Sequence, residues 1–224
     1  MTETADTVFL FDVDNTLLDN DRFQADLGAH LADNYGPEAR DRFWVIFEEL
    51  RAELGYADYL GTLERFRLGA MHHPKMLRIA NWLVDYPFHE RLYPNAVPVV
   101  QAAQRVGITA ILSDGDAVFQ PRKVEKSGLW RVFGDNVLIY IHKELELADV
   151  ETHFPARHYV VIDDKLRILD AVKRIWADRV TTVFPRQGHY AADSKILSEF
   201  PAADITIDHI GDLLEYNLAA LAKR

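Results

Sequence analysis

The chain has 224 residues, of which 49% are hydrophobic, and it carries a formal net charge of −10. This length suits one large domain, or a core domain with a smaller insertion. The acidic balance argues against nucleic acid or an anionic membrane as the main partner, because either would attract a basic surface. The absence of cysteine excludes disulfides and thiolate zinc sites, and it favours a cytoplasmic protein.

The sequence shows no targeting or membrane-spanning signal. Residues 1–6 are polar and lack the basic segment with which a signal peptide begins. No apolar run approaches the roughly 20 residues that a transmembrane helix needs. We therefore expect neither secretion nor membrane association.

An apolar run near the N-terminus leads directly into acidic residues. Residues 8–11 read Val-Phe-Leu-Phe, which is typical of a strand buried on both faces of a sheet. Asp12 and Asp14 follow this run, and Thr16 comes two residues later. A buried strand that ends in carboxylates places negative charge at the carboxyl edge of the sheet, where open α/β sheets bind their ligands.

The next seventy or so residues contain no convincing strand, and their apolar residues recur at helical spacing. Gly36 and Pro37 separate the first two predicted helices, and Gly55 ends the second. A fourth helix can begin at Pro74, with an apolar stripe through Leu77, Asn81, Leu83 and Val84. Antiparallel helices with short links predict a small bundle. The predicted helices cover approximately residues 23–35, 37–54, 59–68 and 74–86.

From residue 93 onward, helical and strand patterns alternate. Repeated β-α units predict a parallel sheet with helices on both faces and right-handed crossovers. The predicted fold class is therefore α/β, a Rossmann-like parallel sheet with an inserted α-helical bundle. Residues 1–16 and 93–224 would form the core domain, and residues 17–92 the inserted domain. The further strands are expected at residues 108–112, 137–141, 158–162, 180–184 and 205–207.

Polar residues stand at the ends of these predicted strands. Ser113, Asp114 and Gly115 follow one strand, Lys143 closely follows the next, and the pair at residues 163–164 is Asp-Asp. The carboxyl ends of parallel strands meet at one edge of a sheet, so these side chains are expected near Asp12.

Together these segments resemble the four motifs of the haloacid dehalogenase (HAD) superfamily, in the same order. Asp12-x-Asp14-x-Thr16 resembles the first motif and Ser113 the second. Lys143, placed 20 residues before Asp163, resembles the third motif, and the Asp163-Asp164 pair resembles the fourth. The helical insertion after the first motif is similar to the helical cap of many members, so the resemblance covers essentially the whole chain.

The resemblance implies a role for each polar residue. Asp12 would be a nucleophile that forms an aspartyl-phosphate, and Asp14 would be the general acid and base. Lys143 would pair with both Asp12 and the phosphate. The phosphate-binding set would be Ser113, Asp114, Gly115, Lys143 and Thr16, through side chains and backbone N–H groups, with Thr16 also orienting Asp14.

The same resemblance implies Mg²⁺ as the cofactor. Its ligands would be Asp12, the backbone carbonyl of Asp14 and Asp163, with Asp164 bound directly or through water. These are the oxygen ligands that Mg²⁺ prefers. The cation would reduce the repulsion between an attacking carboxylate and a phosphate dianion.

One departure from the family pattern, one alternative explanation and one competition among lysines qualify this assignment. Asp114 stands where many family members carry Asn, and its carboxylate would repel phosphate unless it turns away. Ser113, taken alone, is equally explained as the N-cap of the following helix. Lys123, Lys126 and Lys165 compete with Lys143, which is preferred because it closely follows a predicted buried strand.

The function implied by the resemblance is a Mg²⁺-dependent phosphatase that hydrolyses a small phosphomonoester metabolite. A sugar-phosphate mutase shares these motifs and stays open as an alternative. Haloacid dehalogenases use the first Asp but lack the metal and the second carboxylate, which Asp14 and Asp163-Asp164 provide here. A non-catalytic phosphate-binding protein is disfavoured by the complete acidic set. The sequence names neither the substrate nor the oligomeric state.

Overall fold

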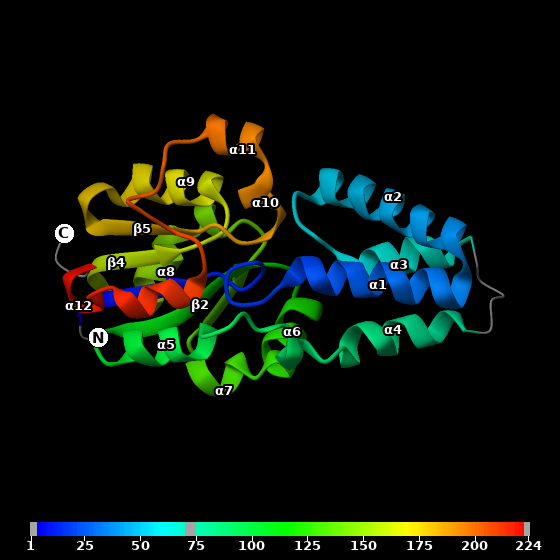
Figure 1. Cartoon of the computed structure of the whole chain (residues 1–224), viewed down its shortest axis with the longest axis horizontal. Helices are drawn as coiled ribbons and strands as arrows, with labels where there is room; N and C mark the ends of the chain where they lie inside the picture. The colour runs from blue at the N-terminus through cyan, green and yellow to red at the C-terminus, as the bar shows by residue number, and fades with distance from the viewer. Residues whose placement is uncertain (1–3, 70–74, 222–224) are drawn as a thin grey trace.

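The computed structural model describes residues 4–69 and 75–221. Its centre is a six-stranded parallel sheet in the order β3-β2-β1-β4-β5-β6, which confirms the predicted α/β fold (Figure 1). The strands are β1 (Ala5–Phe11), β2 (Ile108–Asp114), β3 (Val137–Tyr140), β4 (Ala156–Ile162), β5 (Val180–Pro185) and β6 (Ile205–Ile207).

The strand order has one topological switch point, and it lies at β1. The chain adds β2 and β3 on one side of β1 and then returns to place β4 on the other side. In sheets of this kind, ligands bind where the strand order reverses, outside the carboxyl ends of the strands. The acidic residues that follow β1 and β4 therefore meet at the position where a site is expected.

Both faces of β1 are buried, as its apolar run predicted. Phe9 and Phe11 belong to a hydrophobic cluster with α5 (Ala96–Gln104) and α7 (Leu129–Phe133). Val8 and Leu10 belong to a second cluster with α8 (Leu147–His153) and α9 (Leu166–Trp176). All four side chains are at most 1% exposed, because helices cover both faces of the sheet.

The inserted segment folds into helices that lie beyond the carboxyl end of the sheet, and we call this group the helical lobe (Figure 1). Gly36 and Gly55 end its first two helices with φ angles of 92° and 81°, a region that glycine adopts without the steric cost of a Cβ atom. The helices are α1 (Asn20–Tyr35), α2 (Pro37–Leu54), α3 (Tyr59–Arg67) and α4 (Met76–Asp85).

The stripe predicted for the last of these helices was partly wrong. Leu77 is 75% exposed, whereas Ile79 and Leu83 are fully buried. Residues 77 and 79 project to nearly opposite sides of a helix, so the packed side could not include both. The predicted start at Pro74 lies outside the described residues.

The two connections between the lobe and the sheet run side by side. Leu18 and Leu92 form an antiparallel bridge. The backbone N–H of Tyr93 donates to the Leu17 carbonyl at 2.9 Å, and that of Asp19 donates to the Arg91 carbonyl at 2.8 Å. The lobe is thus joined to the core by a short paired segment. The predicted domain division at residues 16/17 and 92/93 stays a prediction.

An aromatic cluster packs the lobe against the core. The ring of Phe23 in α1 lies 5.0–5.8 Å, centroid to centroid, from those of Tyr59, Tyr86, Phe88 and Phe119. Phe119 begins α6 (Phe119–Ser127) in the core, and Phe88 begins the short 3₁₀ helix η1 (Phe88–Arg91) on the returning connection. The seam between lobe and core is therefore a packed aromatic interior.

Among the described residues, no helix combines the length and the apolarity that crossing a bilayer requires.

We predict that Phe23→Ala destabilises the protein by about 3–5 kcal/mol, the usual cost of removing a buried Phe ring. The reason is that Phe23 is fully buried at the centre of the aromatic cluster. Val45→Ala is the control, because Val45 is 57% exposed and its loss should change the free energy of unfolding by less than about 0.5 kcal/mol. Urea titrations measure the stability of both variants. A midpoint for Phe23→Ala equal to that of Val45→Ala would contradict the prediction.

Candidate active site

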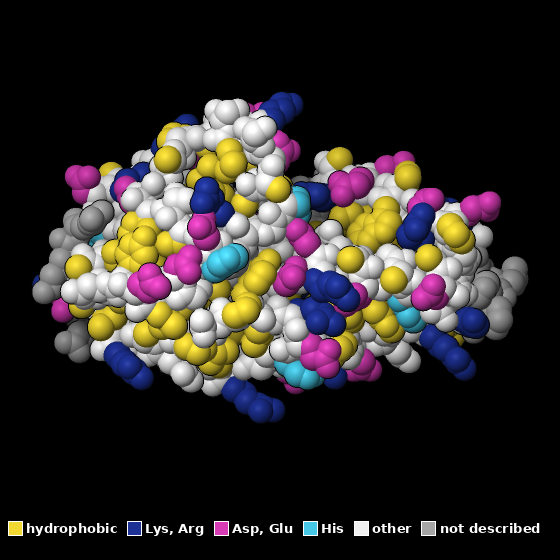
Figure 2. All heavy atoms as spheres, viewed as in Figure 1, with side chains coloured by type: hydrophobic (Ala, Val, Ile, Leu, Met, Phe, Trp, Pro, Cys, Tyr) yellow, Lys and Arg dark blue, Asp and Glu magenta, His cyan; other side chains and the backbone are white. Residues whose placement is uncertain are grey.

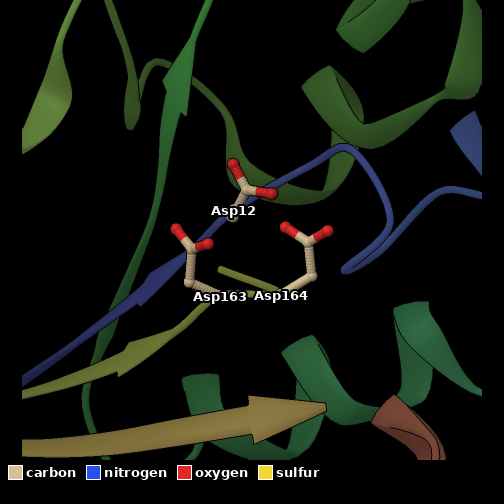
Figure 3. Close-up of side chains that lie close together, drawn as sticks. All are labelled: Asp12, Asp163 and Asp164. Atoms are coloured by element: carbon tan, nitrogen blue, oxygen red, sulfur yellow. The ribbon is translucent and has the colours of Figure 1, made fainter. Parts of the chain in front are cut away.

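Three carboxylates converge at the edge between β1 and β4. Phe11 and Ile162 are register partners at the ends of these strands, and the backbone N–H of Asp12 donates to the Ile162 carbonyl at 2.9 Å. Asp12, Asp163 and Asp164 therefore project from the same level of the sheet, and Figure 3 shows their side chains close together. Each offers an oxygen within 4.8 Å of the others, and all three are at most 3% exposed.

Lys143 supplies the cation that this cluster needs. Its Nζ lies 2.5 Å from Asp12 Oδ1 and 2.6 Å from Asp163 Oδ2, and it donates to the Leu112 carbonyl at 3.2 Å. Burial acts to lower the pKa of Lys143, but the surrounding carboxylates more than offset this and raise that pKa well above its usual value. The neighbouring carboxylates therefore favour the charged form of Lys143.

Asp164 is the carboxylate without a partner. Neither of its oxygens accepts a hydrogen bond within the described part of the chain, although the side chain is fully buried. Burial raises the pKa of Asp164 well above its usual value and raises that of Asp163 to about 6. A buried carboxylate with open oxygens beside two others has the oxygen donor set of a hard divalent cation, so these residues fit Mg²⁺.

The turn after β1 is fixed by its own polar side chains. Thr16 Oγ1 donates to Asp12 Oδ2 at 3.2 Å and accepts from the Asp164 backbone N–H at 3.1 Å. Thr16 therefore orients Asp12, not Asp14 as the resemblance implied. Asn15 adopts a left-handed conformation with φ of 58°, and its Oδ1 accepts from the N–H groups of Asn20 and Asp21 at the start of α1.

Asp14 lies outside the cluster of three carboxylates and pairs with a different lysine. Lys123 Nζ lies 2.6 and 2.7 Å from the two oxygens of Asp14. Gln120 Nε2 adds a longer contact of 3.4 Å. The structure thus gives both competing lysines carboxylate partners, with Lys143 at Asp12 and Asp163 and with Lys123 at Asp14.

The end of β2 and the residue that follows it are arranged differently from the predicted phosphate-binding loop. Asp114 Oδ1 accepts from the Lys143 backbone N–H at 2.8 Å, so this carboxylate holds the lysine loop in place, although Asp114 still lines the cavity beside the site. The Gly115 N–H donates to the Tyr140 carbonyl at 2.9 Å, so that amide is not free to bind phosphate. Ser113 Oγ accepts from Gln120 at 3.0 Å instead of capping the next helix, whose start is capped by Asp116.

A cavity of about 670 Å³ lies between the lobe and the core and reaches the carboxylate cluster. Asp14 and Asp164 line its inner end, and Arg51 from α2 and Tyr190 from α10 (Gly188–Ala192) line it farther out. The side chains of Arg51 and Tyr190 are hydrogen-bonded across it. Figure 2 shows the outline of the molecule hollowed between α11 (Ser194–Glu199) and α2, beside this cavity.

Sequence reasoning did not assign two of the cationic residues that line this cavity. Lys165 was weighed against Lys143 and not chosen, although its position directly after the Asp163-Asp164 pair could have placed it at the site. Burial acts to lower its pKa, but the neighbouring Asp164 and Asp12 raise it above the usual lysine value. Arg51 gives no such signal, because an arginine in the last turn of an amphipathic helix is ordinary.

Comparison with known proteins identifies the family. Residues 7–174 match the family described as haloacid dehalogenase-like hydrolase. A haloacid dehalogenase-like hydrolase from Burkholderia xenovorans LB400 is 56% identical, with a TM-score of 0.90, over 95% of this chain and 99% of that one. The chain therefore belongs to the haloacid dehalogenase-like hydrolases, which confirms the resemblance seen in the sequence.

More distant structures share the fold. The L-2-haloacid dehalogenase of Xanthobacter autotrophicus is 20% identical, with a TM-score of 0.62, over 93% of this chain and 96% of that chain. The HAD-hydrolase YfnB of Bacillus subtilis, described as bound to magnesium, is 15% identical with a TM-score of 0.63, over 93% of this chain and 97% of that chain. No curated protein sequence matches the chain.

We predict that Asp164→Asn abolishes Mg²⁺ binding yet stabilises the metal-free protein. The buried carboxyl group accepts no hydrogen bond among the described residues and its pKa is raised on folding, so Asp164 costs the fold stability at every pH above the ordinary aspartate pKa, including neutral pH. At 100 times its Kd, Mg²⁺ should stabilise the wild type by about 2.7 kcal/mol, which raises Tm by roughly 5–10 °C for a protein of this size.

Melting curves in EDTA and in Mg²⁺ measure both effects. The variant should melt above the wild type in EDTA and show no shift with Mg²⁺. Asp178→Asn, at an exposed site in the 3₁₀ turn Ala177–Arg179, should keep the full metal-induced shift. An unchanged shift in Asp164→Asn would mean that the cation binds elsewhere.

Proposed function

We propose that this protein is a Mg²⁺-dependent phosphatase that hydrolyses a small phosphomonoester through an aspartyl-phosphate on Asp12. The observation that carries the proposal is the division of the site into two parts. Asp12 stands in a metal-type cluster with Asp163 and the unpartnered Asp164. Asp14, two residues later, faces the cavity as a separate carboxylate. Dehalogenase relatives need neither the metal cluster nor the second carboxylate.

In the first step, an Asp12 carboxylate oxygen attacks phosphorus and the bond from phosphorus to the leaving oxygen breaks. Asp14, which enters this step protonated on one oxygen while the other still accepts from Lys123, donates that proton to the leaving oxygen, which departs as an alcohol. Lys143 is already within 2.5 Å of Asp12, so its ammonium can pair with the nucleophile and the incoming phosphate together. When bound, Mg²⁺ would be held by Asp12, the backbone carbonyl of Asp14, Asp163 and Asp164, and it would supply positive charge against the phosphate dianion.

In the second step, water hydrolyses the aspartyl-phosphate. Asp14, now ionised, accepts a proton from the attacking water, and phosphate leaves with the carboxylate of Asp12 restored. Thr16 holds Asp12 through its hydroxyl, so the nucleophile keeps one orientation through both steps. The site returns to its starting protonation state after each turnover.

The cavity supports a substrate of metabolite size. Its volume of about 670 Å³ falls within the range of small-molecule sites, and the lobe stands over its outer part. Closure of such a lobe would exclude bulk water before phosphoryl transfer. On the face that Figure 2 presents, acidic and basic side chains are interspersed, and no basic surface for nucleic acid gathers there.

The test is a panel of small phosphomonoesters assayed for phosphate release with Mg²⁺ and with EDTA. We expect Mg²⁺-dependent turnover of at least one ester, and no turnover by a folded Asp12→Asn variant, because Asp12 is both nucleophile and metal ligand. Residual turnover in Asp12→Asn within tenfold of wild type would refute that role. Halide release from 2-chloropropionate, or an isomerised product that keeps its phosphate, would favour the dehalogenase or the mutase instead.

We predict that Lys143→Ala lowers the rate on the best ester by about a hundredfold or more, the usual effect of removing one preorganised charge. Lys143 contacts Asp12 directly, so the loss should appear in kcat. Lys195→Ala removes an exposed lysine and should leave kcat unchanged. Melting curves would show whether each variant is folded, and near-normal kcat in folded Lys143→Ala would reverse the assignment.

A further inference from the structure

Lys123 is a fully buried cation that the proposed reaction does not use. It is 0% exposed, and its Nζ contacts both oxygens of Asp14 at 2.6 and 2.7 Å. It also donates to Asn20 Oδ1 at 3.1 Å. In the described part of the chain, Asp14 is the one carboxylate within ion-pair distance of this ammonium.

Aromatic rings enclose this ammonium. The ring centroids of Phe23, Tyr59, Phe88 and Phe119 lie 5.6–5.9 Å from Lys123 Nζ. A cation among ring faces gains an electrostatic attraction that partly replaces its lost hydration. Phe119 comes from the core, Phe88 from the returning connection, and the other two from the helical lobe. We call these four rings the aromatic box, and it exists only with the lobe seated on the core.

The ion pair between Lys123 and Asp14 is poorly explained as an element that stabilises the fold. A buried ion pair often stabilises a fold no more than apolar residues of the same volume would, because both charges lose hydration. Asp14, however, lines the cavity with its side chain 26% exposed, while the fully buried Lys123 contacts its carboxylate. The pair therefore fixes the position of a carboxylate at a surface where a substrate can reach it.

We propose that Lys123 is a positioning residue that holds Asp14 in the geometry for protonating the leaving group. The inference rests on the proposed phosphatase function. Lys123 touches neither phosphorus nor the leaving oxygen and keeps its protons throughout, while the proton of Asp14 passes to the departing oxygen. The lobe takes part through Asn20 and two rings of the aromatic box, so Asp14 is held when the cavity is covered.

Leaving-group dependence tests this inference directly. An aryl phosphate such as p-nitrophenyl phosphate needs little protonation of its leaving group, whereas an alkyl phosphate needs full proton transfer. In Lys123→Met, which keeps length and fits the apolar box, kcat/KM should fall about a hundredfold or more for alkyl esters. For the aryl ester it should fall less than about threefold. A general distortion of the site would lower both classes alike.

Two further variants complete the experiment. Lys126 lies three residues later on α6, and its ammonium pairs with Asp85 at the surface. The control variant Lys126→Met should leave kcat/KM unchanged for both aryl and alkyl esters. Asn20→Leu removes the oxygen that holds the ammonium of Lys123, and it should give a smaller loss with the same leaving-group dependence. It carries the test if Lys123→Met does not fold.

A double-mutant cycle with Asp14→Asn identifies the route of the effect. If Lys123 acts through Asp14, adding Lys123→Met to Asp14→Asn should bring no further leaving-group-dependent loss. Equal losses for aryl and alkyl esters, or a full additional loss in the double variant, would overturn this inference alone. A wild-type protein that releases phosphate from no ester of the series would overturn the proposed function, and this inference with it.

Discussion

The rest of the site depends on how negative charge is balanced at the edge between β1 and β4. Parallel pairing of these strands brings carboxylate oxygens of Asp12, Asp163 and Asp164 within 4.8 Å of one another, with all three side chains buried. The ammonium of Lys143 contacts Asp12 and Asp163 and offsets part of this charge, but it leaves Asp164 without a hydrogen-bond partner among the described residues. A divalent cation would restore the balance, and this is the physical reason for proposing Mg²⁺ at the cluster.

The protein keeps its acidic groups in two separate sets. The turn after β1 sends Asp12 inward to Lys143 and Asp14 sideways to Lys123, although the two carboxylates stand only two residues apart. Each set has its own lysine, so a change in the protonation of one carboxylate need not change the protonation of the other. This separation is what a reaction with a nucleophile and a proton carrier requires, since the two groups must be in different protonation states at the same moment.

The sequence was a good guide where one strand or one strand end carried the signal. Continuous apolar runs predicted the strands, and the polar residues that follow them predicted Asp12, Lys143 and the Asp163-Asp164 pair. Local patterns failed where packing between distant segments decides. Leu77 resembled a core residue and is exposed, and Lys123 resembled a surface lysine and is fully buried. Its burial depends on rings from four segments between residues 23 and 119, which no local window contains.

The paired connections at Leu18 and Leu92 have a consequence for how such a protein can diverge. The chain leaves and re-enters the core at adjacent points, so a different insertion can be accommodated there without altering any strand of the sheet. Chemistry and substrate choice can then evolve as separate modules. The aromatic box limits this freedom, because any replacement must again supply apolar walls for the ammonium of Lys123. Exchange of lobes between relatives is therefore constrained at the seam, while the outer surface of the lobe is free to vary.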